Sequence, residues 1–265
     1  MVFFAGLPGT GKSLLVHQLA HVAIAAGRSV HLLQWDVARP RFEACSAGQL
    51  YPQADGVTHP LIRRAAGRWV RHAIAEWHDH YPAGRHLLIG ETPLIGNRFS
   101  ELAHRWDDAA EALLGSESCR FVIAVPSAAV RAFIEAERDR RTASPLHPRE
   151  REDAPPHVLR DLWRDLLSAG DRLGLGPAGG HAGGLPYDPV LYRRIYEAVL
   201  RHRATEALSI DIVLPSEAIS VYDFAEPLPD LLPADADAER FTREAERQYP
   251  QRAALDDLIA RWWCA

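Results

Sequence analysis

The sequence contains very little of several residue types. Its 30 lysine and arginine residues include a single lysine, Lys12. There is one methionine, and there are three cysteines. The cysteines lie far apart without a C-x-x-C pair, which argues against a structural zinc site and favours a reducing compartment. No apolar run is long enough to span a membrane and no signal peptide is recognisable, so we expect no membrane partner and a cytoplasmic location.

The rest of the composition is typical of a globular protein. Of the 265 residues, 47% are hydrophobic and 25% are charged, with a formal net charge of −5. An acidic balance argues against a general nucleic-acid binder, although it leaves room for a local basic site. The length fits one large α/β domain, or one domain with a helical accessory.

The single lysine lies in a glycine-rich motif close to the start of the sequence. Residues 6–13 read Gly-Leu-Pro-Gly-Thr-Gly-Lys-Ser, which matches the Walker A pattern G-x-x-x-x-G-K-[ST]. The apolar residues 2–5 predict a buried parallel strand before the motif, and the apolar period over 14–26 predicts a helix after it. In that setting, backbone N–H groups and the helix N-terminus can surround a phosphate. The predicted ATP-binding residues are Gly6, Pro8, Gly9, Thr10, Gly11, Lys12, Ser13 and Leu14.

The lone lysine supports this interpretation. In such a motif Lys12 reaches the β- and γ-phosphates, which makes it a catalytic residue, and the Ser13 hydroxyl binds Mg²⁺. Every other cationic position except histidine uses arginine, whereas a compact ammonium on a flexible stem suits a phosphate site. The alternative is a chance glycine-rich turn before an amphipathic helix.

Two acidic residues follow predicted strands. Asp36 comes after residues 29–35, and Glu91 ends the predicted strand 86–91. Ligands bind at the carboxyl ends of strands in open α/β sheets. We therefore predict Asp36 as a substrate-binding general base, with a helix cap or turn residue as the alternative. We predict that Glu91 binds metal or substrate or orients a nucleophile, with a structural role as the alternative.

Arginines supply further candidate contacts. We predict that Arg39 binds substrate, and that Arg98 does so at the start of a helix over 97–114; solvated side chains are the alternative. Arg138 begins a predicted lid over about 138–156, in which Arg140 and Arg141 stabilise the transferring phosphoryl group. The alternative for this cluster is a charged helix end. A third set, on a helix predicted over 59–80, is interpreted mainly as a solvated stripe: Arg64, Arg68 and Arg71.

The remaining chain continues the alternation of strands and helices. Strands are predicted over 120–126 and 208–214, and helices over 127–141 and 157–173, and from 188 onward. Five strands alternating with helices predict a three-layer α/β/α fold, a P-loop NTPase with a mostly parallel five-stranded sheet. We divide the chain into a core over 1–225, which includes the lid, and a C-terminal helical extension over 226–265 that Pro250 interrupts.

The order of these features resembles the P-loop kinases, the broad group that includes adenylate, shikimate and zeta-toxin-type kinases. The resemblance covers roughly residues 1–225, and only the phosphate loop is a highly specific match. It implies a base at Asp36, a metal-site carboxylate at Glu91 and lid arginines after residue 137. Glu91 stands where such enzymes usually carry aspartate, which places direct metal ligation by this residue in doubt.

The leading hypothesis is an ATP-dependent phosphotransferase that moves the γ-phosphate to a hydroxyl of a small molecule or nucleotide, with ATP and Mg²⁺ as cofactors. One alternative is an oligomeric P-loop ATPase, although those enzymes usually carry an Asp-Glu pair where this chain has Gly90-Glu91. The other is a polynucleotide 5′-kinase, which makes nucleic acid an allowed but not favoured partner. The sequence leaves open the acceptor, the choice of purine nucleotide and the oligomeric state.

Overall fold

A computed structural model gives the fold of this chain. It describes residues 1–54, 56–81, 84–144, 147, 155–176, 185–213 and 227–264, without the side chains of residues 139 and 141–143. In these described residues, every helix is too short or too polar to cross a membrane. Much of the predicted lid and of the glycine-rich stretch 174–184 falls outside the described residues.

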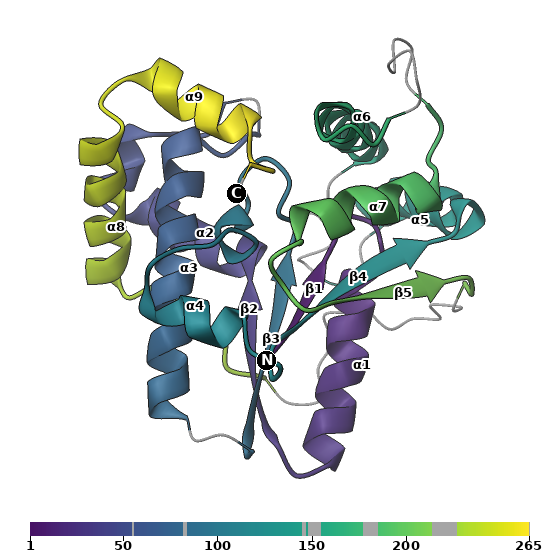
Figure 1. The fold of residues 1–265 in the computed structure, drawn as a ribbon, viewed down its shortest axis with the longest axis horizontal. Helices are drawn as coiled ribbons and strands as arrows, with labels where there is room; N and C mark the ends of the chain where they lie inside the picture. Colours follow the sequence, from purple (N-terminus) through teal and green to yellow (C-terminus); the bar gives the residue numbers. More distant parts are fainter. Residues whose placement is uncertain are drawn as a thin grey trace.

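Five parallel strands form the central sheet. Their order is β2-β3-β1-β4-β5, so β1 lies in the middle, as Figure 1 shows. The prediction of a five-stranded sheet is confirmed, and the sheet is parallel throughout. The strands are β1 (Val2–Ala5), β2 (Ser29–Gln34), β3 (His86–Thr92), β4 (Arg120–Pro126) and β5 (Thr205–Ile210).

Helices cover both faces of the sheet. Side chains alternate along β1, so Phe4 faces α1 (Lys12–Ala25), while Phe3 and Ala5 face the larger core. Figure 1 shows α1 set apart from the other helices. The larger core includes buried residues of α2 (Trp35–Ala44), α3 (Pro60–His80), α6 (Pro156–Arg172) and α7 (Pro189–Val199). The α/β class with helices on both faces is therefore confirmed.

Several helix starts lie where the sequence placed them, because capping side chains fix them. The Ser127 hydroxyl accepts the Val130 N–H at 3.3 Å and begins α5 (Ala128–Ala143). A carboxylate oxygen of Asp188 accepts the N–H groups of Val190 and Leu191 at the start of α7. The helix predicted over 59–80 is α3, which His59 caps.

The helix predicted over 97–114 is wrong. The chain instead forms an irregular loop, the short 3-10 helix η2 (Ser100–Leu102) and the short helix α4 (Ala109–Leu114). Three residues of the loop that are not glycine have positive φ angles near 60°: Leu94, Asn97 and Phe99. A helix cannot contain this left-handed backbone, which L-residues rarely adopt.

The C-terminal helices pack against the body of the fold. Helix α8 (Asp235–Gln248) lies along α3, and α9 (Arg252–Ala260) follows after Pro250 (Figure 1). The preceding segment pairs with the outer edge of β2, because the N–H of Leu32 donates to Pro229 O and the N–H of Leu231 donates to Leu32 O. The predicted pair of C-terminal helices is confirmed, and it contacts the part of the chain that follows β2.

Candidate functional site

The loop between β1 and α1 has the backbone conformation that its glycines permit. Gly6, Gly9 and Gly11 have φ angles of 150°, 70° and 82°. A Cβ atom at Gly6 would lie 2.4 Å from the Tyr192 hydroxyl, and one at Gly9 would lie 3.1 Å from Leu159. Both the backbone angles and the available space therefore require glycine at the first two positions.

This loop presents a run of backbone donors without protein acceptors. Within the described part of the chain, the amide N–H groups of residues 9–14 find no acceptor, and Leu15 is the first to donate, to Gly11 O at 3.2 Å. The last three belong to the first turn of α1, whose dipole is positive at this end. The first turn contains no acidic side chain and Gly11 provides no capping side chain. Such a run of donors suits a phosphate.

Lys12, Ser13 and Glu91 meet beside this loop. The Lys12 ammonium, which is buried, donates to Leu7 O at 2.8 Å and lies 3.4 Å from Glu91 Oε1. The Ser13 hydroxyl donates to Glu91 Oε2 at 3.2 Å. Burial lowers the pKa of Lys12, and the Glu91 carboxylate opposes that effect. Neighbouring strand ends bring the predicted catalytic lysine, the serine and the acid together, because Glu91 pairs with Phe4 in the sheet.

A row of tyrosines holds the ends of three central strands. The rings of Tyr187, Tyr192 and Tyr196 contact one another in turn at tilted angles, with centroids 5.6 Å and 4.9 Å apart. Tyr192 accepts the Leu7 N–H at 3.1 Å, whereas Tyr187 and Tyr196 each donate at 3.0 Å, to O of Pro126 at the end of β4 and to O of Pro93 after β3. The row thus fixes the loop after β1 relative to the neighbouring strand ends. This role could not be predicted from the sequence, since the contacts join residues up to 185 positions apart.

Arg131 is a second residue that the sequence analysis missed. Its Nη1 donates to Pro8 O at 2.9 Å and to Gly9 O at 3.2 Å, and its Nη2 donates to Leu159 O at 3.2 Å. The side chain is buried and also pairs with Glu135 at 3.0 Å. Arg131 therefore joins the phosphate loop to α5 and α6. An arginine on the core-facing side of a helix was the available signal.

Asp36 lies in the first turn of α2, on the β2 side of the site. The residue is accessible to solvent. Surrounding protein nevertheless raises the pKa of its carboxyl group by desolvation, and the Glu91 charge raises it further; Arg39, Arg98 and Lys12 oppose the shift. Asp36 therefore lies close enough to the predicted site residues to interact with them, and a raised pKa makes its carboxylate a better proton acceptor.

Two of the predicted arginines face this side of the site. Arg98 donates to Ile95 O at 3.1 Å, and its charge interacts with those of Asp36 and Arg39. Arg39 pairs with Glu43 at 2.7 Å on the same helix. Arg63, which the sequence analysis did not select, lies beside Arg98. The structure therefore places Asp36, Arg39 and Arg98 close enough for their charges to interact.

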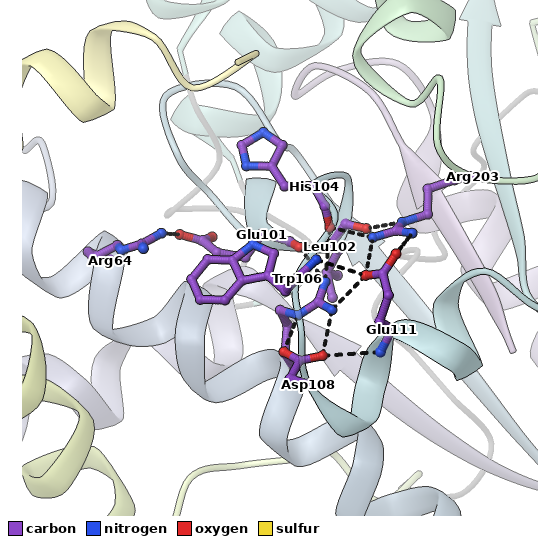
Figure 2. A network of polar contacts seen from close by, with 9 residues as sticks. Arg64, Glu101, Leu102, His104, Trp106, Asp108, Glu111 and Arg203 are labelled. Carbon is purple, nitrogen blue, oxygen red and sulfur yellow. Dashed lines mark hydrogen bonds and ion pairs between the residues drawn. The ribbon is translucent and has the colours of Figure 1, made fainter. Parts of the chain in front are cut away.

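A buried polar network holds the loop that carries Arg98. Glu101 is fully buried and accepts a hydrogen bond from Arg64 Nη1 at 2.8 Å, which Figure 2 shows. Glu101 also accepts one from Asn97 Nδ2 at 3.0 Å. Asn97 in turn accepts the Ser100 hydroxyl at 2.7 Å. These bonds fix a segment whose backbone angles are strained at three residues, and strain of this kind persists only where surrounding contacts enforce it.

The interpretation of Arg64, Arg68 and Arg71 as a solvated stripe is wrong for two of the three. Arg64 is buried against Glu101, and Arg71 is buried between Asp108 and Glu111 at 2.6 Å and 2.8 Å. Figure 2 shows that Glu111 also binds Arg203, at 2.8 Å. Only Arg68 is partly exposed, where it bonds Gln248 and lies 3.6 Å from Glu244. Acidic partners from the following segment neutralise the buried charges, which removes this basic face as a nucleic-acid surface.

The predicted lid arginines differ in how they are placed relative to the loop after β1. Arg140 is 69% exposed at its side chain and pairs with Glu137 one turn away on α5, so the structure does not bring it to the phosphate loop. The Arg141 side chain lies outside the described residues. Arg138 is the lid residue whose charge acts on Lys12. The described residues contain no cluster of three or more metal-ligating His, Cys, Asp or Glu side chains.

Comparisons with protein-family models, with curated proteins and with solved structures found no match for this chain. The fold and the geometry of the loop after β1 therefore supply the basis for a functional assignment.

Proposed function

We propose that this chain is an ATP-dependent phosphotransferase that moves a γ-phosphate to the hydroxyl of a small acceptor. The observation that carries the proposal is the run of N–H groups over residues 9–14, which have no acceptor among the described residues and lie beside the only lysine of the chain. Clustered amide donors at a helix N-terminus favour a ligand rich in anionic oxygens. A triphosphate supplies such oxygens.

The donor set beside the loop fits a magnesium ion. Ser13 Oγ and Glu91 Oε2 lie 3.2 Å apart and offer a hydroxyl and a carboxylate oxygen, the ligand types that Mg²⁺ prefers. In the proposed site these two residues hold Mg²⁺, directly or through water, and Lys12 contacts the phosphates. A bound Mg²⁺ supplies charge neutralisation for the transferring group.

Asp36, Arg39 and Arg98 form the proposed acceptor side of the site. In the proposed reaction, the acceptor oxygen forms a bond to the γ-phosphorus, the bond from that phosphorus to the β,γ-bridging oxygen breaks, and ADP leaves. Asp36 takes the proton of the acceptor hydroxyl, a role that its raised pKa supports. Positive charge from Lys12 and Arg138 lies on the donor side. An ATPase without an acceptor has no use for the paired base and arginines, which favours a kinase.

Nucleotide binding by Lys12→Met tests the proposal. We expect the wild-type chain to bind ATP with Mg²⁺, and the variant to bind it about 10- to 100-fold more weakly, since a hydrogen bond to a charged group contributes about 1.5–3 kcal/mol. Arg193→Met is the matched control, because Arg193 is an exposed residue of α7 that pairs with Glu197. Isothermal titration calorimetry measures both.

Acceptor-dependent ADP release then separates a kinase from an ATPase. We expect a panel of hydroxylated small molecules to contain a compound that raises ADP release by wild type and not by Asp36→Asn. Equal ATP binding by wild type and Lys12→Met, or absence of ATP binding by wild type, would contradict the proposal.

A further inference from the structure

Two arginines converge beside the loop that follows β3. A Cβ atom placed on Gly96 would lie 3.2 Å from Nη1 of Arg63 and 3.2 Å from Nη1 of Arg98. Arg63 comes from the first turn of α3 and Arg98 from the strained loop, so two separate elements bring the guanidinium groups to one point.

Within the part of the chain that the structure describes, the charges of these two arginines lack an ionic partner. Arg63 donates to the carbonyl oxygens of Thr58 and Gly96, both at 2.9 Å, and Arg98 donates to Ile95 O at 3.1 Å. Neither forms an ion pair with any residue that the structure describes. Desolvation and, to a smaller extent, the neighbouring charge of Arg98 lower the pKa of Arg63 to about 9.

The other buried arginines of the described chain differ in this respect. Each of them pairs with a carboxylate: Arg64 with Glu101, Arg71 with Asp108 and Glu111, Arg131 with Glu135, and Arg203 with Glu111. A buried charge without a partner is costly. Among the buried arginines that the structure describes, Arg63 is therefore the one without a carboxylate partner. It lies next to Arg98, which also forms no ion pair there.

Two aspartates carry charges that act on these arginines, but neither aspartate forms an ion pair with them. The charges of Asp165 on α6 and of Asp36 on α2 act on Arg98, and that of Asp165 acts also on Arg63. Both aspartates are exposed, and neither is ion-paired with these arginines. Two guanidinium groups that face the same point without an acid between them are suited to an external anion, which each can bind with parallel N–H groups.

We propose that Arg63 and Arg98 bind an anionic group of the acceptor, a carboxylate or a phosphate, so that the acceptor is a small hydroxylated anion. This inference rests on the proposed phosphotransferase function and specifies its substrate class. The anion at the arginine pair orients the acceptor so that its hydroxyl faces Asp36, whose charge interacts with that of Arg98. Neutral sugars and cationic acceptors lack the group that the pair recognises.

Binding of simple anions tests the proposal on the full chain. Malonate serves as the carboxylate probe and inorganic phosphate as the phosphate probe, each titrated into wild type by calorimetry. Arg98→Gln is the informative variant, because the only side-chain hydrogen bond of Arg98 within the described chain is to nearby Ile95 O, whereas the Arg63 side chain links two segments. We expect Arg98→Gln to weaken binding of the preferred probe at least about tenfold, the loss of one charged bidentate contact. Arg98→Lys, which keeps the charge, restores part of the affinity.

Two further variants separate this site from the phosphate loop. Lys12→Met leaves binding of the preferred probe at the arginine pair unchanged, and Arg193→Gln, the matched surface control, leaves it unchanged as well. Binding of the probe that is lost with Lys12→Met and retained in Arg98→Gln would place the anion in the phosphate loop and overturn the proposal. A wild-type protein that binds ATP but neither probe would also overturn it and leave the proposed function intact, whereas absence of ATP binding counts against the function itself.

Discussion

Glu101 offers the sharpest test of how the site is held. The substitution Glu101→Gln keeps the shape of the side chain and removes its charge. In the native structure this carboxylate is fully buried and accepts from Arg64 and Asn97 through Oε1, while Oε2 has no hydrogen-bond partner. The variant leaves the Arg64 guanidinium buried without its counter-charge.

The expected magnitude follows from the burial of both partners. The Arg64 side chain is 8% exposed and that of Glu101 is 0% exposed, so solvent does little to screen the pair. Removing one member of a buried pair costs about 3–5 kcal/mol. The glutamine oxygen still accepts one hydrogen bond, so we expect a loss near the lower end, about 3 kcal/mol. A chain with an ordinary stability of about 5–15 kcal/mol remains folded after that loss.

Urea denaturation at neutral pH measures the effect. The control is Glu197→Gln, which removes the partner of Arg193 in an exposed pair on α7 and is expected to cost about 0–1 kcal/mol. The urea midpoint should fall while the slope of free energy against urea stays constant. A loss in Glu101→Gln no larger than in the control would refute the reasoning that this pair is a buried, compensated charge that stabilises the loop.

Two other perturbations probe the site and the pH response. Tyr192→Phe removes the acceptor of the buried Leu7 N–H, so we expect a loss of about 1–3 kcal/mol in the free energy of unfolding and weaker ATP binding. Tyr51→Phe, whose phenol bonds the partly exposed Glu246, should affect ATP binding little. Equal ATP affinities in both variants would contradict this. Burial lowers the pKa of His104 below its ordinary 6.5, so the unfolded chain binds the proton first and stability falls as the pH drops below 6.5. His104→Gln should flatten this decline in urea midpoints measured from pH 7.5 to 5.5, and an unchanged slope would exclude His104 as its source.

The sequence predicted best those features that depend on near neighbours. Strand β4 was predicted with its observed bounds, because residues 120–126 form a compact apolar run and Ser127 caps the helix behind it. The backbone shape of the loop after β1 also follows local sequence, because the glycines at positions 6, 9 and 11 permit its positive φ angles. Strand β5 begins three residues and ends four residues before its predicted bounds, since it lies at the sheet edge with exposed side chains on both faces and its apolar pattern is weak.

The features that were missed depend on partners far away in the chain. A helical pattern alone predicts that arginines on a polar face are solvated. Arg64 and Arg71 instead bind acids that lie 37 or more positions later in the chain. The positive φ angles of Leu94 and Phe99 contradict the local preference of both residues, and only tertiary contacts enforce them. Arg63 was not predicted for the same reason, since its guanidinium group lies beside that of Arg98, 35 positions later in the chain.

The strand order explains why the proposed donor and acceptor halves lie at the ends of different strands, β1 and β2. Strand β1 carries the phosphate loop and occupies the centre, with β4 and α5 on one side and β3 and then β2 on the other. Neighbouring strands lie about 4.7–4.9 Å apart, so the end of β2, which leads to Asp36, lies roughly 10 Å from the end of β1. In the proposed function, that separation accommodates a phosphoryl group and an acceptor hydroxyl between Lys12 and Asp36. Glu91 ends the intervening strand, accepts the Ser13 hydroxyl and adds to the rise in the pKa of Asp36 that desolvation causes. The charge of this one residue therefore acts on both proposed halves of the site.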